Sequence, residues 1–295
     1  MDPRAVLTAI LVLVPFGGAL LCAVLGARKA IRSTIVLATG AVLIASALML
    51  APLVPFRLEV AAFLGVDLHR LIQVADAVLL LVILYYGFKH KHPAIVALAA
   101  LQLGLTLYLD GVLVKGPPPA ERIFCDHLSL LMVLIISIVG SIICFQALPY
   151  MENHEHHYHV MRSRQPRFFF VMLLFLGGMN GLVLFDDLTF IYFFFEVTTL
   201  CSFLLIGHDR TTIATRNALR ALWMNSVGGA AFILGIIAAY LETGSLALQK
   251  VLTPWLAGSG VYLLALALLC LAAFVKAAQF PFQSWLLGAM VAPTP

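Results

Sequence analysis

The chain has 295 residues, of which 62% are hydrophobic and only 11% are charged, and its formal net charge is +4. A soluble domain carries about 25% charged residues, so this composition excludes an ordinary soluble protein and predicts an integral membrane protein. The five cysteines form no C-x-x-C pair and therefore no iron–sulfur or zinc motif. We predict no cofactor or metal in this chain and no nucleic-acid partner.

Apolar runs of about 20 residues predict nine membrane-spanning helices. These runs lie near residues 5–25, 33–52, 72–88, 93–110, 127–148, 167–185, 188–207, 216–241 and 260–280, and a tenth begins near Phe282. The predicted fold class is an all-α polytopic bundle of about 9–10 transmembrane helices. The first run is similar to a signal-peptide core but lacks an obvious cleavage site, so we expect it to be retained as a helix.

The third and fourth predicted helices are the least regular, because Gln73, Asp76 and Gln102 lie in or near them. Residues 116–119 (Gly-Pro-Pro-Pro) form the strongest break in the chain and predict an external loop. Most lysines and arginines fall in the loops that follow odd-numbered helices. Basic loops stay in the cytoplasm, so this distribution predicts an external N-terminus. The expected location is the plasma (inner) membrane of a prokaryote.

Two ionisable residues stand inside predicted helices, where charge is costly. Glu196 lies about 12 Å from the start of its helix, close to the middle of the membrane. Lys276 lies in the last apolar run. A charged side chain at the bilayer centre costs about 2.5–3.5 kcal/mol, and such residues are functional candidates by default. The alternatives are a buried structural ion pair for Glu196 and a lysine that reaches to the interface for Lys276.

A proline follows Lys276 by five residues and predicts a broken helix. Pro281 has no N–H, which leaves the carbonyl of Ala277 without its helical partner. The side chain of Gln279 could help to satisfy the freed backbone groups. A broken helix beside a lysine in the membrane is a way to build an ion site. Because burial and pairing shift the proton affinities of carboxylate and ammonium groups in opposite directions, the pair is suited to proton transfer.

Other polar residues are less specific. Arg220 lies about one turn inside its helix, as a fixed charge that tunes its neighbours or as an interfacial anchor. His208 stands at a helix end and is either a structural terminus or a cytoplasmic proton relay. Asp186 and Asp187 predict solvated caps in a tight turn. The run HEHHYH at residues 154–159 could bind a transition metal, but we favour a solvated loop because it lacks structural zinc spacing.

From about residue 124 onward, several sequence blocks resemble the antiporter-like proton-pumping subunits. That family includes the large membrane subunits of complex I, the multisubunit Na⁺/H⁺ (Mrp) antiporters and energy-converting membrane hydrogenases. The matching blocks are DHLSL at 126–130, RFF at 167–169, FEVTTLCSFLLIG at 195–207, KAAQFPFQSWL at 276–286 and AMVAPTP at 289–295.

The resemblance implies that Glu196 and Lys276 are the paired residues of the first half-channel. Arg220 departs from the family, which has lysine there, and Gly229 stands where complex I relatives can have aspartate. The block NALRALWMNS at 217–226 and the histidine-rich run are similar to the large membrane subunit of energy-converting or CO-induced hydrogenases.

This resemblance predicts two parts of the chain. Residues 1–115 would be N-terminal transmembrane helices, including an extra helix pair within residues 60–115. Residues 124–295 would be the first half of the antiporter-like proton-translocating domain, ending where family members continue into a second half. We therefore expect a fragment, a split subunit or a truncated product.

The expected function is ion translocation, of H⁺ or alternatively Na⁺, by a membrane subunit of a redox-driven respiratory-type complex. The complex would be a membrane-bound hydrogenase or an NADH dehydrogenase-like oxidoreductase whose partner subunits carry iron–sulfur and nickel–iron centres. The chain itself would hold no redox centre and would be an enzyme only as part of that assembly. The alternatives are a subunit of a secondary Na⁺/H⁺ antiporter and a structural membrane anchor.

Overall fold

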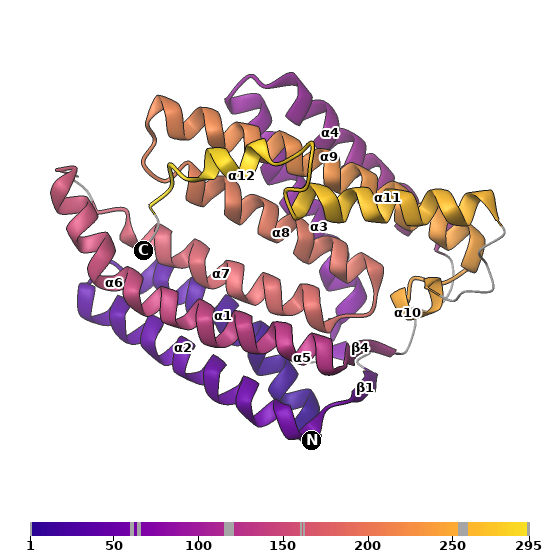
Figure 1. The fold of residues 1–295 in the computed structure, drawn as a ribbon, viewed down its shortest axis with the longest axis horizontal. Helices are drawn as coiled ribbons and strands as arrows, with labels where there is room; N and C mark the ends of the chain where they lie inside the picture. Colours follow the sequence, from indigo (N-terminus) through magenta and orange to yellow (C-terminus); the bar gives the residue numbers. More distant parts are fainter. Residues whose placement is uncertain are drawn as a thin grey trace.

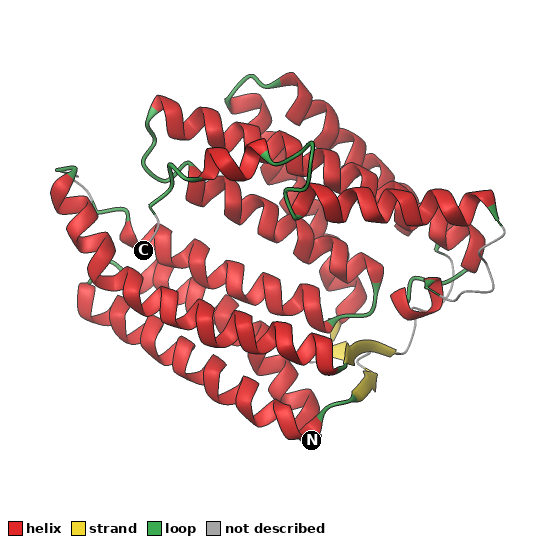
Figure 2. Cartoon of the chain, in the orientation of Figure 1, coloured by secondary structure: helices red, strands yellow, loops and turns green. Residues whose placement is uncertain are grey.

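The computed structural model describes residues 2–59, 62–63, 66–114, 121–159, 161, 163–252 and 259–293. Helices dominate this part of the chain, with two short two-stranded sheets beside them (Figure 2). Eight helices are long and apolar enough to cross a membrane, and a shorter apolar helix covers Gly260–Lys276. The prediction of an all-α polytopic membrane protein is confirmed. The predicted loop at residues 116–119 and the end of the last sequence block, residues 294–295, lie outside the described residues.

All nine predicted spans are present as helices, with two further short helices, α10 and α12, near the C-terminal end. The helices are α1 (Pro3–Leu25), α2 (Lys29–Leu50), α3 (Leu68–Lys89), α4 (Pro93–Tyr108), α5 (His127–Leu134), α6 (Gly140–His157), α7 (Gln165–Leu184), α8 (Leu188–Ile206), α9 (Thr212–Thr243), α10 (Leu248–Val251), α11 (Gly260–Lys276) and α12 (Ser284–Ala289). The 3₁₀ turn η1 (Ala51–Leu53) extends α2, the π-helical turn η2 (Leu109–Leu113) extends α4, and a second π-helical turn, η3 (Ile135–Val139), joins α5 to α6.

The strands form two small antiparallel pairs. Strand β1 (Phe56–Glu59) pairs antiparallel with β4 (Glu121–Cys125), so that Phe56 lies opposite Cys125. Strand β2 (Ala62–Phe63) pairs with β3 (Val66–Asp67). The β1–β4 pair brings the segment after α2 next to the segment before α5, across the intervening helices α3 and α4.

Helix α8 lies between two groups of helices (Figure 1). On one side α7 contacts α8 and packs on α1, which in turn packs on α2. On the other side α9 and α3 contact α8, and α4, α11 and α12 pack on α9 or α3. Lipid tails are as apolar as leucine, so an apolar surface alone does not bury a membrane helix inside a bundle. Helix α8 carries Glu196, Thr198 and Thr199, which are all buried, and its central position keeps these polar groups away from lipid.

The first helix is an integral part of the bundle. Leu11 and Ala19 of α1 are fully buried, and the buried Asn180 of α7 donates a hydrogen bond to the Leu11 carbonyl at 3.0 Å. These contacts pack the first helix tightly against α7.

Two expectations about polar segments were wrong. The histidine-rich run is not a loop up to residue 157, because α6 continues to His157 and is held there by polar contacts. His154 contacts the Asp209 carboxylate at 3.0 Å, and Glu155 accepts a hydrogen bond from the Gln165 side chain at 2.7 Å. Among the described residues, no group of three or more His, Cys, Asp or Glu side chains is placed to hold a metal ion.

Asp186 and Asp187 are buried rather than solvated. Asp187 does cap α8, accepting hydrogen bonds from the backbone and the hydroxyl of Thr189. The Asp186 carboxylate accepts the N–H of Gln249 at 3.1 Å, and its backbone carbonyl accepts the N–H of Leu248 at 2.8 Å, so Asp186 joins the start of α8 to the segment around α10. The carboxylates are buried because this segment folds back over the turn.

The contact between α7 and α8 is close enough to test by substitution. A Cβ at Gly181 would lie 2.5 Å from the nearest atom of the Phe194 ring, whereas a Cβ at Gly17 of α1 would meet nothing within 4 Å. Gly181→Ala should lower the stability of the detergent-solubilised protein by about 1–3 kcal/mol, because overpacking forces buried side chains to move. Gly17→Ala is the matched control and should leave the unfolding midpoint unchanged; equal midpoints for the two variants would contradict this packing.

Candidate functional site

Glu196 lies at the centre of the bundle on α8. Its residue exposure is 0%, and neither carboxylate oxygen has a hydrogen-bond partner in the protein. Burying a carboxylate without hydrogen bonds is unfavourable unless another charge, a proton or water compensates it. The surroundings of Glu196 are therefore the natural place to look for a compensating group.

Lys276 is the last residue of α11, and its ammonium lies against the helical turn that contains Glu196. The Nζ atom donates to the Phe195 carbonyl at 3.0 Å and to the Thr199 hydroxyl at 2.9 Å. It also lies 4.3 Å from the centre of the Phe195 ring, within the range of a cation–π interaction. A cation at the C-terminal end of a helix is further stabilised by the helix dipole.

The ammonium and the carboxylate do not form a direct ion pair in this arrangement. Lys276 uses two of its three donors on Phe195 and Thr199, while its charge still acts on Glu196 through the intervening space. Glu196 belongs to the turn of α8 that Lys276 contacts from the end of α11.

On its other side, the Glu196 carboxylate faces α9 and α4. Gly229 of α9 provides the space, because a Cβ at this position would overlap the carboxylate. The same hypothetical atom would lie 2.9 Å from Oε1 of Gln102, so the amide and the carboxylate share this space. Gln102 is fixed by two hydrogen bonds, accepting from the Tyr192 hydroxyl at 3.0 Å and donating to the Ser226 carbonyl at 2.8 Å.

The expected break in the last long helix is present, but it falls earlier than Pro281. Helix α11 ends at Lys276, and Ala278 has a left-handed backbone with φ of 51°. The expectation for Gln279 was wrong, since this residue is exposed and its side chain makes no hydrogen bond among the described residues. Instead, Trp285 of α12 donates its indole N–H to the Val275 carbonyl at 2.9 Å, which ties α12 to the end of α11.

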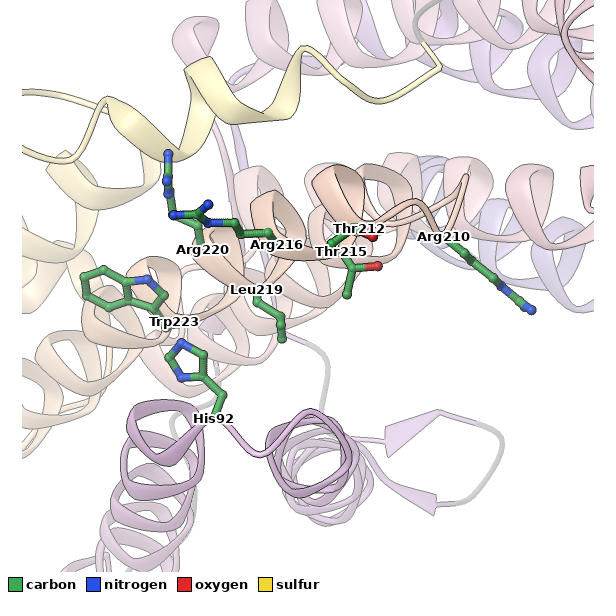
Figure 3. A pocket seen from close by; sticks show the side chains of 8 residues that line it. All are labelled: His92, Arg210, Thr212, Thr215, Arg216, Leu219, Arg220 and Trp223. Carbon is green, nitrogen blue, oxygen red and sulfur yellow. The ribbon is translucent and has the colours of Figure 1, made fainter. Parts of the chain in front are cut away.

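Arg220 is not part of this cluster. It lies nine residues before Gly229 on α9, about 13 Å along the helix. With His92, Arg216 and Trp223 it lines a cavity of about 560 Å³ near the start of α9 (Figure 3). The structure thus places Arg220 among other basic groups at the end of the bundle, remote from Glu196.

His208 is also remote, just beyond the C-terminal end of α8. Its exposure is 3%, and its ring packs edge-on against Phe168 with centroids 5.3 Å apart. Burial lowers the pKa of His208 to about 4, although the neighbouring Asp209 favours the charged form. His208 is therefore an uncharged buried side chain at neutral pH.

Sequence reasoning missed several residues of the site: Thr199, Gln102, Tyr192 and Trp285. Thr199 was part of a quoted motif, but its contact with Lys276 depends on how α11 packs, which no local pattern encodes. Gln102 was noted only as an irregularity in an apolar helix. A buried amide must find hydrogen-bond partners, and that requirement was the signal that could have placed it inside the protein.

The fold and the site define a class, a polytopic membrane protein with a buried carboxylate and a lysine on a broken helix. Residues 186–295 match the family model described as NADH:quinone oxidoreductase/Mrp antiporter, TM. The antiporter subunit mnhA2 of Staphylococcus aureus (strain USA300 / TCH1516) is 35% identical over 173 residues, 58% of this chain and 21% of that protein. The chain thus spans about a fifth of the curated relatives that it matches.

Two solved structures share the fold. The Mrp complex from Dietzia sp. DQ12-45-1b matches with a TM-score of 0.66 and 24% identity, over 97% of this chain and 25% of that one. The membrane-bound sulfane sulfur reductase, an archaeal respiratory membrane complex, matches with a TM-score of 0.65 and 17% identity, over 97% and 47%. The resemblance to antiporter-like, complex I-type membrane subunits that was inferred from the sequence blocks is confirmed by the family-model match over residues 186–295 and by the antiporter-subunit relative.

The burial of His208 generates a pH prediction. The unfolded chain binds the histidine proton near pH 6.5, whereas the folded chain binds it only near pH 4. The folded state should therefore lose stability as the pH falls from about 6.5 toward 4, because the unfolded state binds more protons in that window. His208→Gln should remove this part of the loss.

Exchange of the imidazole C2 hydrogen, followed by mass spectrometry of the 208-containing peptide, measures the histidine pKa directly. Half-protonation well below pH 6 is expected. Ordinary titration near pH 6.5 would show that the ring is hydrated and that the packing against Phe168 is wrong.

Proposed function

We propose that the chain is an ion-translocating membrane subunit in which Glu196 and Lys276 bind and release the translocated ion, a proton. The observation that carries this proposal is the pair itself. A carboxylate without a hydrogen-bond partner lies at the centre of the bundle, one residue from the backbone carbonyl that holds a lysine ammonium. Ionisable residues in this position are maintained for function more often than for stability.

The proposed step is a change of partner by Lys276. In the observed arrangement the ammonium is held by Phe195 and Thr199, away from the carboxylate. When Lys276 turns toward Glu196, the attraction between ammonium and carboxylate favours the ionised pair, and Glu196 gives up a proton. When it turns back, the isolated carboxylate takes up a proton again. A lysine suits this role because, unlike arginine, it also changes its own proton affinity on burial.

The proposed setting is a redox-driven respiratory-type complex, either a hydrogenase-linked or an NADH:quinone oxidoreductase-like assembly. Its other subunits would carry the iron–sulfur and nickel–iron centres. The hydrogenase branch is supported by the NALRALWMNS block and the histidine-rich run in the sequence. The general setting is supported by the fold shared with a respiratory membrane complex.

A second candidate is a subunit of a secondary Na⁺/H⁺ antiporter with no redox partner. The 35% identity with an antiporter subunit and the fold shared with the Mrp complex favour it. Vesicles containing the native complex separate the two. Acidification driven by an electron donor supports the redox-driven assembly, whereas proton movement driven only by a sodium gradient supports the antiporter.

Lys276→Ala and Glu196→Gln should each reduce proton translocation by at least about tenfold without dissociating the complex, because proton transfer by a positioned group contributes about 10²–10⁴-fold. Translocation is measured with a pH-sensitive dye in vesicles, alongside the driving reaction. The exposed pair Lys29 and Glu152, which are 2.7 Å apart, supplies matched controls. Lys29→Ala and Glu152→Gln should leave translocation unchanged; unchanged translocation in Lys276→Ala would remove this lysine from the mechanism.

Gly229→Ala tests the geometry around Glu196 without altering a charge. The added methyl group would overlap the carboxylate and displace it. A displacement of about 1 Å can cost up to 10²-fold in rate, so translocation should fall by about tenfold or more. Gly104→Ala on α4 adds a methyl group into open space and is the control. Equal rates in the two variants would contradict the observed position of the carboxylate.

A further inference from the structure

The Glu196–Lys276 pair leaves one buried acid of the bundle unexplained. Asp76 of α3 has a residue exposure of 3%, and neither of its carboxylate oxygens has a hydrogen-bond partner in the protein. Helix α3 packs on α4 and on α8. The electric field of the Asp76 carboxylate reaches both Tyr192 and Glu196 of α8. A second unpartnered acid therefore lies next to the proposed ion site.

Asp76 and Glu196 lie at the same depth from the same face of the bundle. Helices α3 and α8 begin side by side, since the His69 ring stacks on the Phe190 ring with centroids 6.4 Å apart. Each carboxylate stands eight residues after the first residue of its helix, which corresponds to about 12 Å. The two acids are thus lateral neighbours.

Polar side chains connect Asp76 with the face at which α3 and α8 begin. His69 lies in the first turn of α3, and its Nε2 is 2.9 Å from the Gln73 amide nitrogen. The Gln73 amide also lies against the Asp110 carboxylate, whose field in turn reaches Asp76. Asp110 is only half-buried and lies in the π-helical turn η2. Such turns occur frequently at functional sites.

The polar groups His69, Gln73, Asp110 and Asp76, here called the file, lead to the space beside Glu196. Thr106 of α4, 7% exposed, has a hydroxyl without a hydrogen-bond partner, and Tyr192 and Gln102 lie beside it with the hydrogen bond already described. The titratable groups that interact with Asp76 are Asp110 from η2 and Tyr192 and Glu196 from α8, while His69 of its own helix interacts with Asp110. Mixed nitrogen and oxygen groups of this kind suit proton transfer, whereas a hard cation is held by several converging oxygens.

We propose that Asp76 is a proton-binding site that exchanges protons with Glu196 and is reached from the face where α3 and α8 begin, past His69, Gln73 and Asp110. The inference rests on the proposed function of Glu196 and adds an access branch supplied by the helix pair α3–α4. Each transfer moves one proton from a carboxyl group to a neighbouring carboxylate, so that one O–H bond breaks and one forms. The face concerned is opposite to the basic ends of α6 and α9, and therefore external if the predicted orientation holds.

Asp76→Asn in the complex that contains the chain tests the proposal. The variant should slow proton translocation by at least about tenfold, because it removes a positioned proton-transfer group. Asp126→Asn is the matched control. It removes a carboxylate at the same end of the bundle but outside the file, and asparagine can still cap α5, where Asp126 now accepts the Ser129 N–H. This control should translocate at the native rate.

The outcomes are distinguishable. Native translocation in Asp76→Asn, together with loss in Glu196→Gln, overturns the access branch and leaves the proposed function standing. Native translocation in both variants overturns both. The proposal is also overturned if Asp76 binds sodium in place of a proton. In that case the variant would lose translocation only when sodium is present.

Labelling of the native complex with a hydrophobic carbodiimide keeps the proposal testable if Asp76→Asn fails to assemble. This reagent modifies protonated carboxyl groups in apolar surroundings, and peptide mass spectrometry locates the adduct. Asp76 should be labelled, and acidifying the face where α3 begins should increase the labelling. The access branch would be overturned if labelling of Asp76 increased only when the opposite face was acidified, or if no adduct formed at Asp76.

Discussion

The rest of the site depends on the contact between the Lys276 ammonium and α8. It joins the end of α11 to the central helix through the Phe195 carbonyl and the Thr199 hydroxyl. The lysine can reach α8 only because α11 ends at this residue and does not continue through the membrane. The Trp285 indole stabilises that ending by donating to the Val275 carbonyl. Helix end, lysine and central helix therefore form one unit.

In this arrangement the Lys276 ammonium is stabilised by groups other than the Glu196 carboxylate. One backbone carbonyl, a hydroxyl and an aromatic face stabilise the ammonium, while the carboxylate one residue away has no partner. A tight ion pair would be stable but would respond weakly to its surroundings, because both charges would already be neutralised. Two nearby charges with separate environments can instead be coupled by a small movement, as an ion-translocating site requires.

The sequence predicted much of the fold because membrane spans depend on local composition. All nine predicted apolar runs are helices. The inner positions of Glu196 and Lys276 followed from the cost of charge in lipid. The orientation, the two-part division of the chain and the view of α3–α4 as an insertion stay predictions.

The remaining details depend on contacts between distant segments. Thr199 and Trp285 acquire their roles only when α11 and α12 dock on α8 and α9. Gln73, Asp76 and Gln102 made two helices look irregular, whereas in the fold Asp76 and Gln102 are buried against α8 and α9. Asp186 and Asp187 were expected in water because turns are usually exposed, but the segment around α10 covers them. Polar residues in apolar helices thus indicated which positions are buried for a reason, but the sequence did not identify the residues that they contact.

The central claim is that Glu196 and Lys276 act as one unit, and a double-variant cycle tests it most directly. Proton translocation is measured for Glu196→Gln, Lys276→Ala and the double variant in vesicles of the native complex. Residues that act together are strongly non-additive, so the double variant should be no slower than the slower single variant. Losses that multiply in the double variant would show that the two residues act independently and would contradict this account.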